Sequence, residues 1–250
     1  MKCRKILVLG SKPNAIIPDQ IDFVYAANCS AHFYNKSIPL SSKLTVVVSA
    51  GRLYRNNLTK KPRFYEIVGS LRGRLVIAGV DKIRDLQKIM ECDIPRVEIK
   101  SFTAKRRRDI FYSVLGGRGL LTPMLKSCLS QTVSKEFLFK YLYHLIRSKM
   151  FGTDVPGKFR PSTGLFALAY AVSEHSEESQ YIVSGIGFGR RVDYPDGSKG
   201  SSESALHHII PDMLYLAELS KKIKIYTTDQ EISKRFSIPM LGDRFQRSLV

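Results

Sequence analysis

Short apolar runs that end at a glycine, a serine or an asparagine recur along the chain, and each is typical of a buried β-strand. The runs that predict strands are 5–9, 23–26, 44–48, 75–78, 97–99, 181–184 and 222–226. Short strands separated by helical segments favour an α/β fold with a Rossmann-like parallel sheet flanked by helices. Four of the runs stop at or lead into small or polar residues, namely Gly10, Asn28, Ser49 and Ser184. Ligands of such sheets bind beyond the carboxyl ends of the strands, so we expect these four positions to face one crevice.

The segment 160–188 combines a loop, a helix, a strand and a second loop. Apolar residues recur at helical spacing between positions 165 and 172, directly after Ser162, Thr163 and Gly164. Serine and threonine oxygens cap helix N-termini, where free backbone N–H groups and the positive end of the dipole favour an anionic group. The strand that follows ends in two small residues, where a ligand can approach the backbone. The alternative interpretation is an ordinary capped helix before a core strand.

The segment 100–158 differs in composition, and we interpret it as a basic helical insertion in a single domain of residues 1–250. It contains four consecutive cations at 105–108, and the sequence KEFLFKYLYHLIRSKMF at 135–151 predicts an aromatic-rich amphipathic helix. Three interpretations of this helix stay open: a core helix with a solvated basic edge, an interfacial helix on anionic lipid, or a nucleic-acid-binding surface. No RNP, KH or zinc-finger pattern supports the third, so nucleic acid is not the partner we expect.

The composition agrees with one domain and adds a strong positive charge. A chain of 250 residues that is 44% hydrophobic can bury one α/β core. Its formal net charge of +18 favours nucleic acid, anionic membrane or phosphorylated ligands. The four cysteines lack CxxC spacing and neighbouring histidines at metal-ligand spacing, which predicts a reducing compartment and no structural zinc. No apolar run approaches the roughly 18 residues of a spanning helix, so we expect a cytoplasmic protein that is peripherally associated with the inner face of the membrane.

Residues 190–206 are rich in glycine, serine and charge, and we interpret them as a flexible lid. Arg190 and Arg191 at its base can hold a phosphate, although a solvated pair is the equal alternative. His207 and His208 follow, at the entrance of a predicted helix that continues through residue 219. Imidazole titrates near neutral pH, so one of these two histidines is a candidate general base.

The order of these segments resembles the small bacterial sialyltransferases of glycosyltransferase family 42. The resemblance rests on LVLGSKPN, VYAANCSAHFY, RPSTGLFALAYAV, YIVSGIGF and HHIIPDMLYLAELSKKIKIY. It covers residues 4–54 and 158–235, and residues 55–157 are unmatched. It is most specific at PSTG, at SGI with Phe188 two residues after the isoleucine, and at a histidine with Asp212 five residues later.

The resemblance implies an inverting, metal-independent glycosyltransferase of variant GT-A fold, with no cofactor. Such an enzyme moves a sialic-acid-type sugar from a CMP donor to a cell-surface glycan or lipooligosaccharide acceptor, so the implied partners are a CMP-sugar, a glycan or glycolipid and an anionic membrane surface. The family's base aligns with His207, and His208 is the competitor. The donor-binding positions are Gly10, Ser11, Asn28, Ser49, Ser162, Thr163, Gly164, Ser184, Gly185 and Ile186. The oligomeric state stays open and includes a homo-oligomer.

Several positions depart from the family. Gly187 stands where the family has an aspartate, Gly189 where it has a tyrosine, and Ser49 where it has an asparagine. The candidates for stabilising the leaving phosphate are then Arg190, Arg191 and Tyr194. These departures leave the sugar open, so a CMP-Kdo-type transferase is one alternative. A non-catalytic nucleotide-binding or nucleic-acid-binding α/β protein is the alternative from another class.

Overall fold

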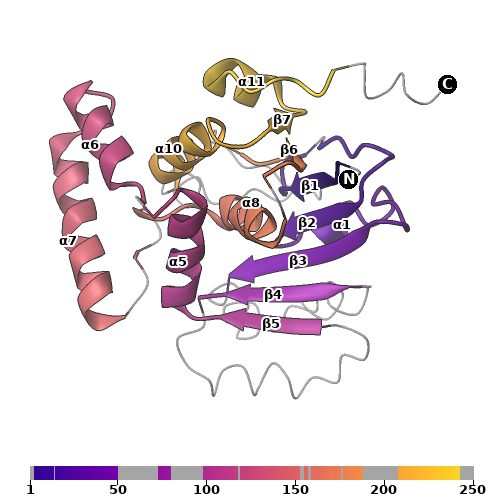
Figure 1. The fold of residues 1–250 in the computed structure, drawn as a ribbon, viewed down its shortest axis with the longest axis horizontal. Helices are drawn as coiled ribbons and strands as arrows, with labels where there is room; N and C mark the ends of the chain where they lie inside the picture. Colours follow the sequence, from indigo (N-terminus) through magenta and orange to yellow (C-terminus); the bar gives the residue numbers. More distant parts are fainter. Residues whose placement is uncertain are drawn as a thin grey trace.

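The fold is built on a seven-stranded, all-parallel sheet with helices on its faces (Figure 1). The computed structural model describes residues 3–13, 15–49, 73–79, 98–117, 119–152, 155–156, 159–175, 177–187 and 208–242. Across the sheet the strands are β5 (Glu98–Phe102), β4 (Arg74–Ala78), β3 (Lys43–Ser49), β2 (Phe23–Ala27), β1 (Lys5–Leu9), β6 (Gln180–Ser184) and β7 (Ile225–Thr227). This arrangement confirms the predicted α/β fold with a Rossmann-like parallel sheet.

The strand order reverses at β1. From β1 to β5 the chain moves steadily toward one edge of the sheet, and β6 then returns to pair with the other side of β1. Leu9, near the end of β1, is level with Ala26 of β2 and with Ser184 of β6. In an open α/β sheet such a reversal marks the place where ligands bind. The strand order therefore predicts a ligand site at the carboxyl ends of β1 and β6.

The strands β1, β2 and β4 are apolar or aromatic after their first residue because both faces of the sheet are covered there, whereas the edge strand β5 contains Glu98, Lys100 and Ser101. Side chains on one face, such as Ile6 and Val8, join the larger core cluster with α8 (Thr163–Glu174) and α10 (Ile209–Leu219). Those on the other face, such as Leu7 and Leu9, pack with the short helix α1 (Ser30–Phe33). Successive residues alternate between the faces, so a run with no polar position is what two covered faces require.

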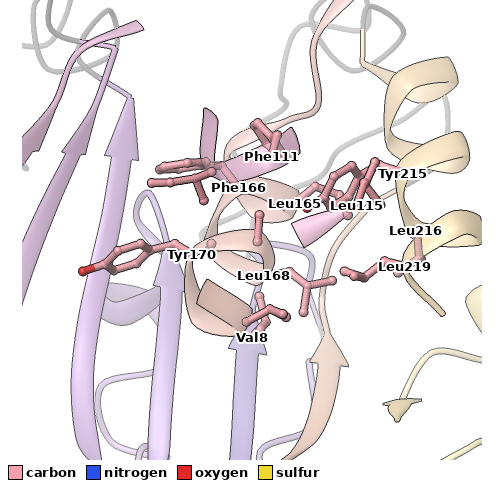
Figure 2. Close-up of a cluster of buried hydrophobic side chains, with 14 of the residues drawn as sticks. Val8, Phe111, Leu115, Leu165, Phe166, Leu168, Tyr170, Tyr215, Leu216 and Leu219 are labelled. Carbon is pink, nitrogen blue, oxygen red and sulfur yellow. The ribbon is translucent and has the colours of Figure 1, made fainter. Parts of the chain in front are cut away.

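The centre of the larger core is α8. Every residue from Leu165 to Tyr170 is at most 2% exposed, and Figure 2 shows α8 between the sheet and Tyr215, Leu216 and Leu219 of α10. A helix that is hydrophobic all round is stable only where it is enclosed on all sides.

Three helices follow β5: α5 (Ala104–Val114), α6 (Leu121–Leu129) and α7 (Lys135–Phe151). Figure 1 shows α5 and α7 on the side toward which the arrowheads of β3, β4 and β5 point. The bounds of α7 are those predicted from its amphipathic pattern, because Ser134 caps its start and Gly152, in the left-handed conformation, ends it. Within the part of the chain that the structure describes, no helix combines the length and apolar character needed to cross a membrane.

Two strands have an end that differs from the prediction by more than one residue. The fifth strand runs on to Phe102, which pairs with Ala78 at the end of β4. The last strand begins only at Ile225, because the N–H groups of Lys222 and Ile223 donate to the carbonyl of Leu219 and complete the turn after α10. The final helix, α11 (Gln230–Phe236), follows β7. The predicted lid at 190–206 lies outside the described residues.

Candidate functional site

The loops after β1 and β6 meet at the point where the strand order reverses. The N–H of Gly10 donates to the carbonyl of Ser184 at 2.8 Å, and the N–H of Lys12 donates to the carbonyl of Gly185 at 2.9 Å. A Cβ on Gly10 would lie only 2.1 Å from the Gly185 carbonyl oxygen. Gly10 is therefore required by contact between the two loops, and Gly185 has a positive φ of 67° that glycine adopts without strain.

The loop after β1 folds over the end of β6. The Ser184 Oγ accepts hydrogen bonds from the N–H of Ile16 at 2.9 Å and from the hydroxyl of Thr228 at 2.7 Å, and Ser184 is fully buried. The hydroxyl of Tyr34, the residue directly after α1, donates to the carbonyl of Lys12 at 2.5 Å and holds the same loop. The small residues at the end of β6 were expected to admit a ligand. In this structure the protein's own loop occupies that space.

Asn28 follows β2 and has the left-handed φ of 55° that asparagine tolerates better than most residues. Its N–H donates to the carbonyl of Val47 in β3 at 2.8 Å, which fixes it at the carboxyl edge of the sheet. Its side-chain Oδ1 is buried and has no hydrogen-bond partner among the described residues. The Ser11 hydroxyl donates to the carbonyl of Ala27, the residue before Asn28, at 3.3 Å, and Ser49 is the last residue of β3.

The N-terminus of α8 lies at the same edge, because α8 precedes the parallel strand β6 and runs antiparallel to it. Ser162 is the N-cap, and its Oγ accepts a hydrogen bond from the N–H of Leu165 at 3.4 Å. Thr163 is the first helical residue, and a Cβ on Gly164 would lie 3.3 Å from the side chain of Ile186. The segment after β6 therefore packs directly on the first turn of α8.

A carboxylate of α10 is hydrogen-bonded to the start of α8. The N–H of Ser162 donates to the Oδ1 of Asp212 at 2.6 Å, and Asp212 is buried. Burial raises the pKa of Asp212 to about 7, although the two Ser162 hydrogen bonds and the charge of Arg107 act in the opposite direction. A single proton on this carboxyl therefore changes the charge next to the helix N-terminus close to neutral pH.

His208 is the residue before α10, and its Nδ1 lies 2.9 Å from the carbonyl oxygen of Arg160. A carbonyl only accepts, so Nδ1 carries the proton in this contact, and in the neutral ring the lone pair is on Nε2. This bond fixes the ring against the segment that leads into α8. His207, Arg190, Arg191 and Tyr194 lie outside the described residues, so their predicted roles stay predictions.

The sequence analysis did not single out Arg107 as a site residue. Arg107 belongs to the cationic run 105–108, yet it is only 2% exposed, and its Nη2 donates to the carbonyl of Pro161 at 3.3 Å. The signal that could have found it is its spacing from Phe111, one helical turn further along α5 on the same face.

Comparison of the chain with protein-family models, with curated proteins and with solved structures gives no match. Among the described residues, no three or more His, Cys, Asp or Glu side chains are grouped so that they could hold a metal ion.

Four kinds of group lie at or near the carboxyl edge of the sheet: backbone N–H groups at a helix N-terminus, a buried amide oxygen, an imidazole with a defined tautomer and a carboxyl that titrates near neutral pH. Such a set can bind a polar anionic ligand and can move a proton.

Proposed function

We propose that the protein transfers a sialic-acid-type sugar from a CMP donor to a cell-surface glycan or glycolipid acceptor. The observation that carries the proposal is the buried Oδ1 of Asn28, which has no hydrogen-bond partner among the described residues. Buried polar atoms are nearly always satisfied in proteins, and an exception at the ligand-binding edge of an α/β sheet suggests a group that a ligand satisfies. The resemblance assigns this position to the donor.

The donor phosphate fits best at the first turn of α8. The N–H groups of Ser162 and Leu165 are used by Asp212 and by the Ser162 hydroxyl. An anion at this end would therefore meet the N–H groups of Thr163 and Gly164, together with the positive end of the dipole. The loop after β1 fills the space directly over Gly185, so the nucleotide would lie beside that loop, between Asn28 and α8.

The acceptor hydroxyl needs a general base, and we assign this role to His207. His208 is tied to the Arg160 carbonyl and acts as a positioning residue that joins α10 to the start of α8. Removal of a general base lowers the rate by roughly 10² to 10⁴-fold. His207→Ala should therefore abolish transfer while CMP binding persists, and His208→Ala, the adjacent control, should cost much less.

The test measures CMP release from CMP-activated sugars, without added metal, for the unchanged protein and both histidine variants. A melting-temperature rise with CMP but not with UDP or GDP would support the cytidine pocket. Turnover that survives in His207→Ala would remove the base assignment. RNA or DNA binding that weakens with salt, without any nucleotide-sugar turnover, would instead favour the alternative of a non-catalytic nucleic-acid-binding protein.

We also propose that an anionic bilayer covers the outer face of α7. Phe139, Tyr143, Ile146 and Met150 are 57 to 73% exposed, and their spacing of four, three and four residues places them on one stripe. Leu138, Tyr141 and Leu145 of the same helix are buried in the core. The helix is therefore apolar on two faces, of which the protein covers one.

Cations border the exposed stripe of α7. At 100° per residue, Lys140 and Arg147 fall on one side of it and Lys135 and Lys149 on the other. An apolar stripe edged by cations is complementary to an interface of acyl chains and anionic headgroups, and the net charge of +18 adds a long-range attraction. A glycolipid acceptor would be found at such a surface.

Vesicle sedimentation tests this surface with a matched pair of variants. Ile146 and Ile16 are 57% and 55% exposed, on α7 and on the loop after β1. Ile146→Ser should lower binding to vesicles of phosphatidylcholine and phosphatidylglycerol several-fold, and Ile16→Ser should not, because only the first lies on the stripe. Equal binding to neutral and anionic vesicles would contradict the proposal. A stable dimer that Ile146→Ser dissociates would assign the stripe to a second copy of the chain.

A further inference from the structure

Asp212 lies where the start of α10 meets the start of α8. Its Oδ1 accepts a hydrogen bond from the N–H of Ser162 at 2.6 Å, and the residue is 2% exposed. Ser162 is the N-cap of α8, so the next backbone N–H groups in the same turn are those of Thr163 and Gly164. The carboxyl of Asp212 and the seat proposed for the donor phosphate are therefore neighbours at one helix N-terminus.

The carboxyl and a bound phosphate compete for the same positive end of the α8 dipole. The ionised carboxyl of Asp212 already interacts with this end of the helix. A phosphate beside it adds a second negative charge in a buried setting, where like charges repel strongly. Two acidic groups that share a site relieve the repulsion when one of them holds a proton, and the pKa of that group rises.

The charged groups around Asp212 leave its proton able to respond to a ligand. Burial raises the pKa of Asp212 to about 7, although Arg107 of α5 acts on it in the opposite direction. The segment that leads into α8 contains Arg160, and arginines keep their charge in proteins. On α10 itself, His208 lies one turn before Asp212 and is bonded to the carbonyl of Arg160. Helix α8 carries no charged residue before Glu174, at its opposite end.

We propose that Asp212 takes up a proton from the solvent when the anionic phosphate of the donor binds at the first turn of α8. The proton returns to the solvent when the phosphate leaves. The protonated carboxyl keeps an oxygen that accepts from the Ser162 N–H, so the contact between α10 and α8 survives the change. Asp212 is then a positioning residue whose charge sets the affinity for the anion. This inference rests on the proposed function, because that proposal places the phosphate at Thr163 and Gly164.

The affinity for CMP at pH 7 and at pH 8.5, measured by isothermal titration calorimetry, tests the coupling. The CMP phosphate is almost fully ionised at both values, because the second pKa of a phosphate monoester is about 6. If bound CMP raises the pKa of Asp212 from about 7 to about 8, the apparent dissociation constant increases about fourfold between these two pH values. At pH 7.5, titrations in two buffers of different ionisation enthalpy should show an uptake of about half a proton per CMP bound.

A matched pair of variants assigns the proton to Asp212. Asp212→Asn keeps an oxygen for the Ser162 N–H and has no proton to exchange, so the weakening at high pH and the proton uptake should both disappear. Asp109→Asn, at an exposed position of α5, should keep both. Histidines titrate in all three proteins, so the differences between them report the aspartate alone.

Two outcomes separate this inference from the proposed function. CMP binding with the same pH dependence in the unchanged protein and in Asp212→Asn, or without proton uptake by the unchanged protein, would overturn the inference and leave the donor assignment in place. The absence of CMP binding at both pH values would overturn the donor assignment and this inference with it. The uptake measurement needs only the unchanged protein, so it decides the question even if Asp212→Asn does not fold.

Discussion

Helices α8 and α7 are both rich in apolar residues, but they have different surroundings. From Leu165 to Ala171, α8 carries no charge and is buried on every side. In α7 the apolar residues form two opposite stripes, and the cations between them prevent the whole helix from entering the core. The comparison teaches that apolar content alone does not predict burial. The position of the charges around a helix decides how many of its faces the protein itself can cover.

The largest expected effect is a pair of substitutions that measures this difference directly. Leu168 in α8 is fully buried, so Leu168→Ala should lower the free energy of unfolding by about 2 to 5 kcal/mol, through lost burial and the cavity that remains. Ile146→Ala on the outer stripe of α7 should change it by less than about 0.5 kcal/mol, because Ile146 is already exposed and alanine favours helix. Urea denaturation followed by circular dichroism measures both values.

Equal destabilisation of the monomer by Ile146→Ala and Leu168→Ala would contradict the difference in burial between α7 and α8. That result would mean that the stripe of α7 is covered within the folded protein. A loss for Ile146→Ala that depends on protein concentration would point to a second copy of the chain.

The second prediction concerns the contact between α10 and α8. The folded pKa of Asp212 is about 7, above its ordinary value of 3.8. The folded state therefore holds its proton longer than the unfolded state, and the free energy of unfolding falls as the pH rises from about 4 to about 7. The fall amounts to at most about 4 kcal/mol for a pKa difference of this size. Asp212→Asn keeps an oxygen that can accept from the Ser162 N–H and cannot ionise, so this variant should lose the pH dependence.

Urea midpoints at pH 4.5 and pH 8 test this prediction. Asp212→Asn should match the unchanged protein at the lower pH and exceed it at the higher pH. Asp109→Asn, at an exposed position of α5, is the matched control and should keep the original pH dependence. If both variants follow the unchanged protein, Asp212 does not govern the stability of this contact.

The features that could be predicted from the sequence are those in which every local signal agrees. The strand β1 is a continuous apolar run from Ile6 to Leu9, and the helix α7 has a serine at its start, a glycine at its end and one stripe for the core. The start of β7 was placed too early because Ile223 is apolar, and only the turn after α10 removes it from the strand. The predicted helical insertion at 100–158 includes α5, but its bounds were not predicted, and the run of cations at 105–108 gave no sign that Arg107 is buried.

The candidate site could be predicted only as a set of positions. Gly10, Asn28 and Ser162 stand at ends of elements, where turn and capping chemistry is visible in a single sequence. Their contacts join residues far apart in the chain, such as Ser162 and Asp212, which are separated by 50 positions. No local pattern predicts such a bond, nor that the loop after β1 would fill the space over Gly185.

The prediction with the smallest expected effect concerns whether α7 opens independently of the sheet. The Ser134 Oγ accepts a hydrogen bond from the N–H of Phe137 at 3.1 Å, and loss of such a cap costs about 1 kcal/mol, or roughly a fivefold change in an opening equilibrium. Since α7 packs through one face, Ser134→Ala should speed amide hydrogen exchange in the first turns of α7 by that factor and leave α8 unchanged. Ser134→Asp restores an acceptor at the cap and should return the exchange of α7 to its original rate. Faster exchange in both helices of Ser134→Ala would instead show that α7 and α8 open together, and the enclosed core would then extend across the whole molecule to α7.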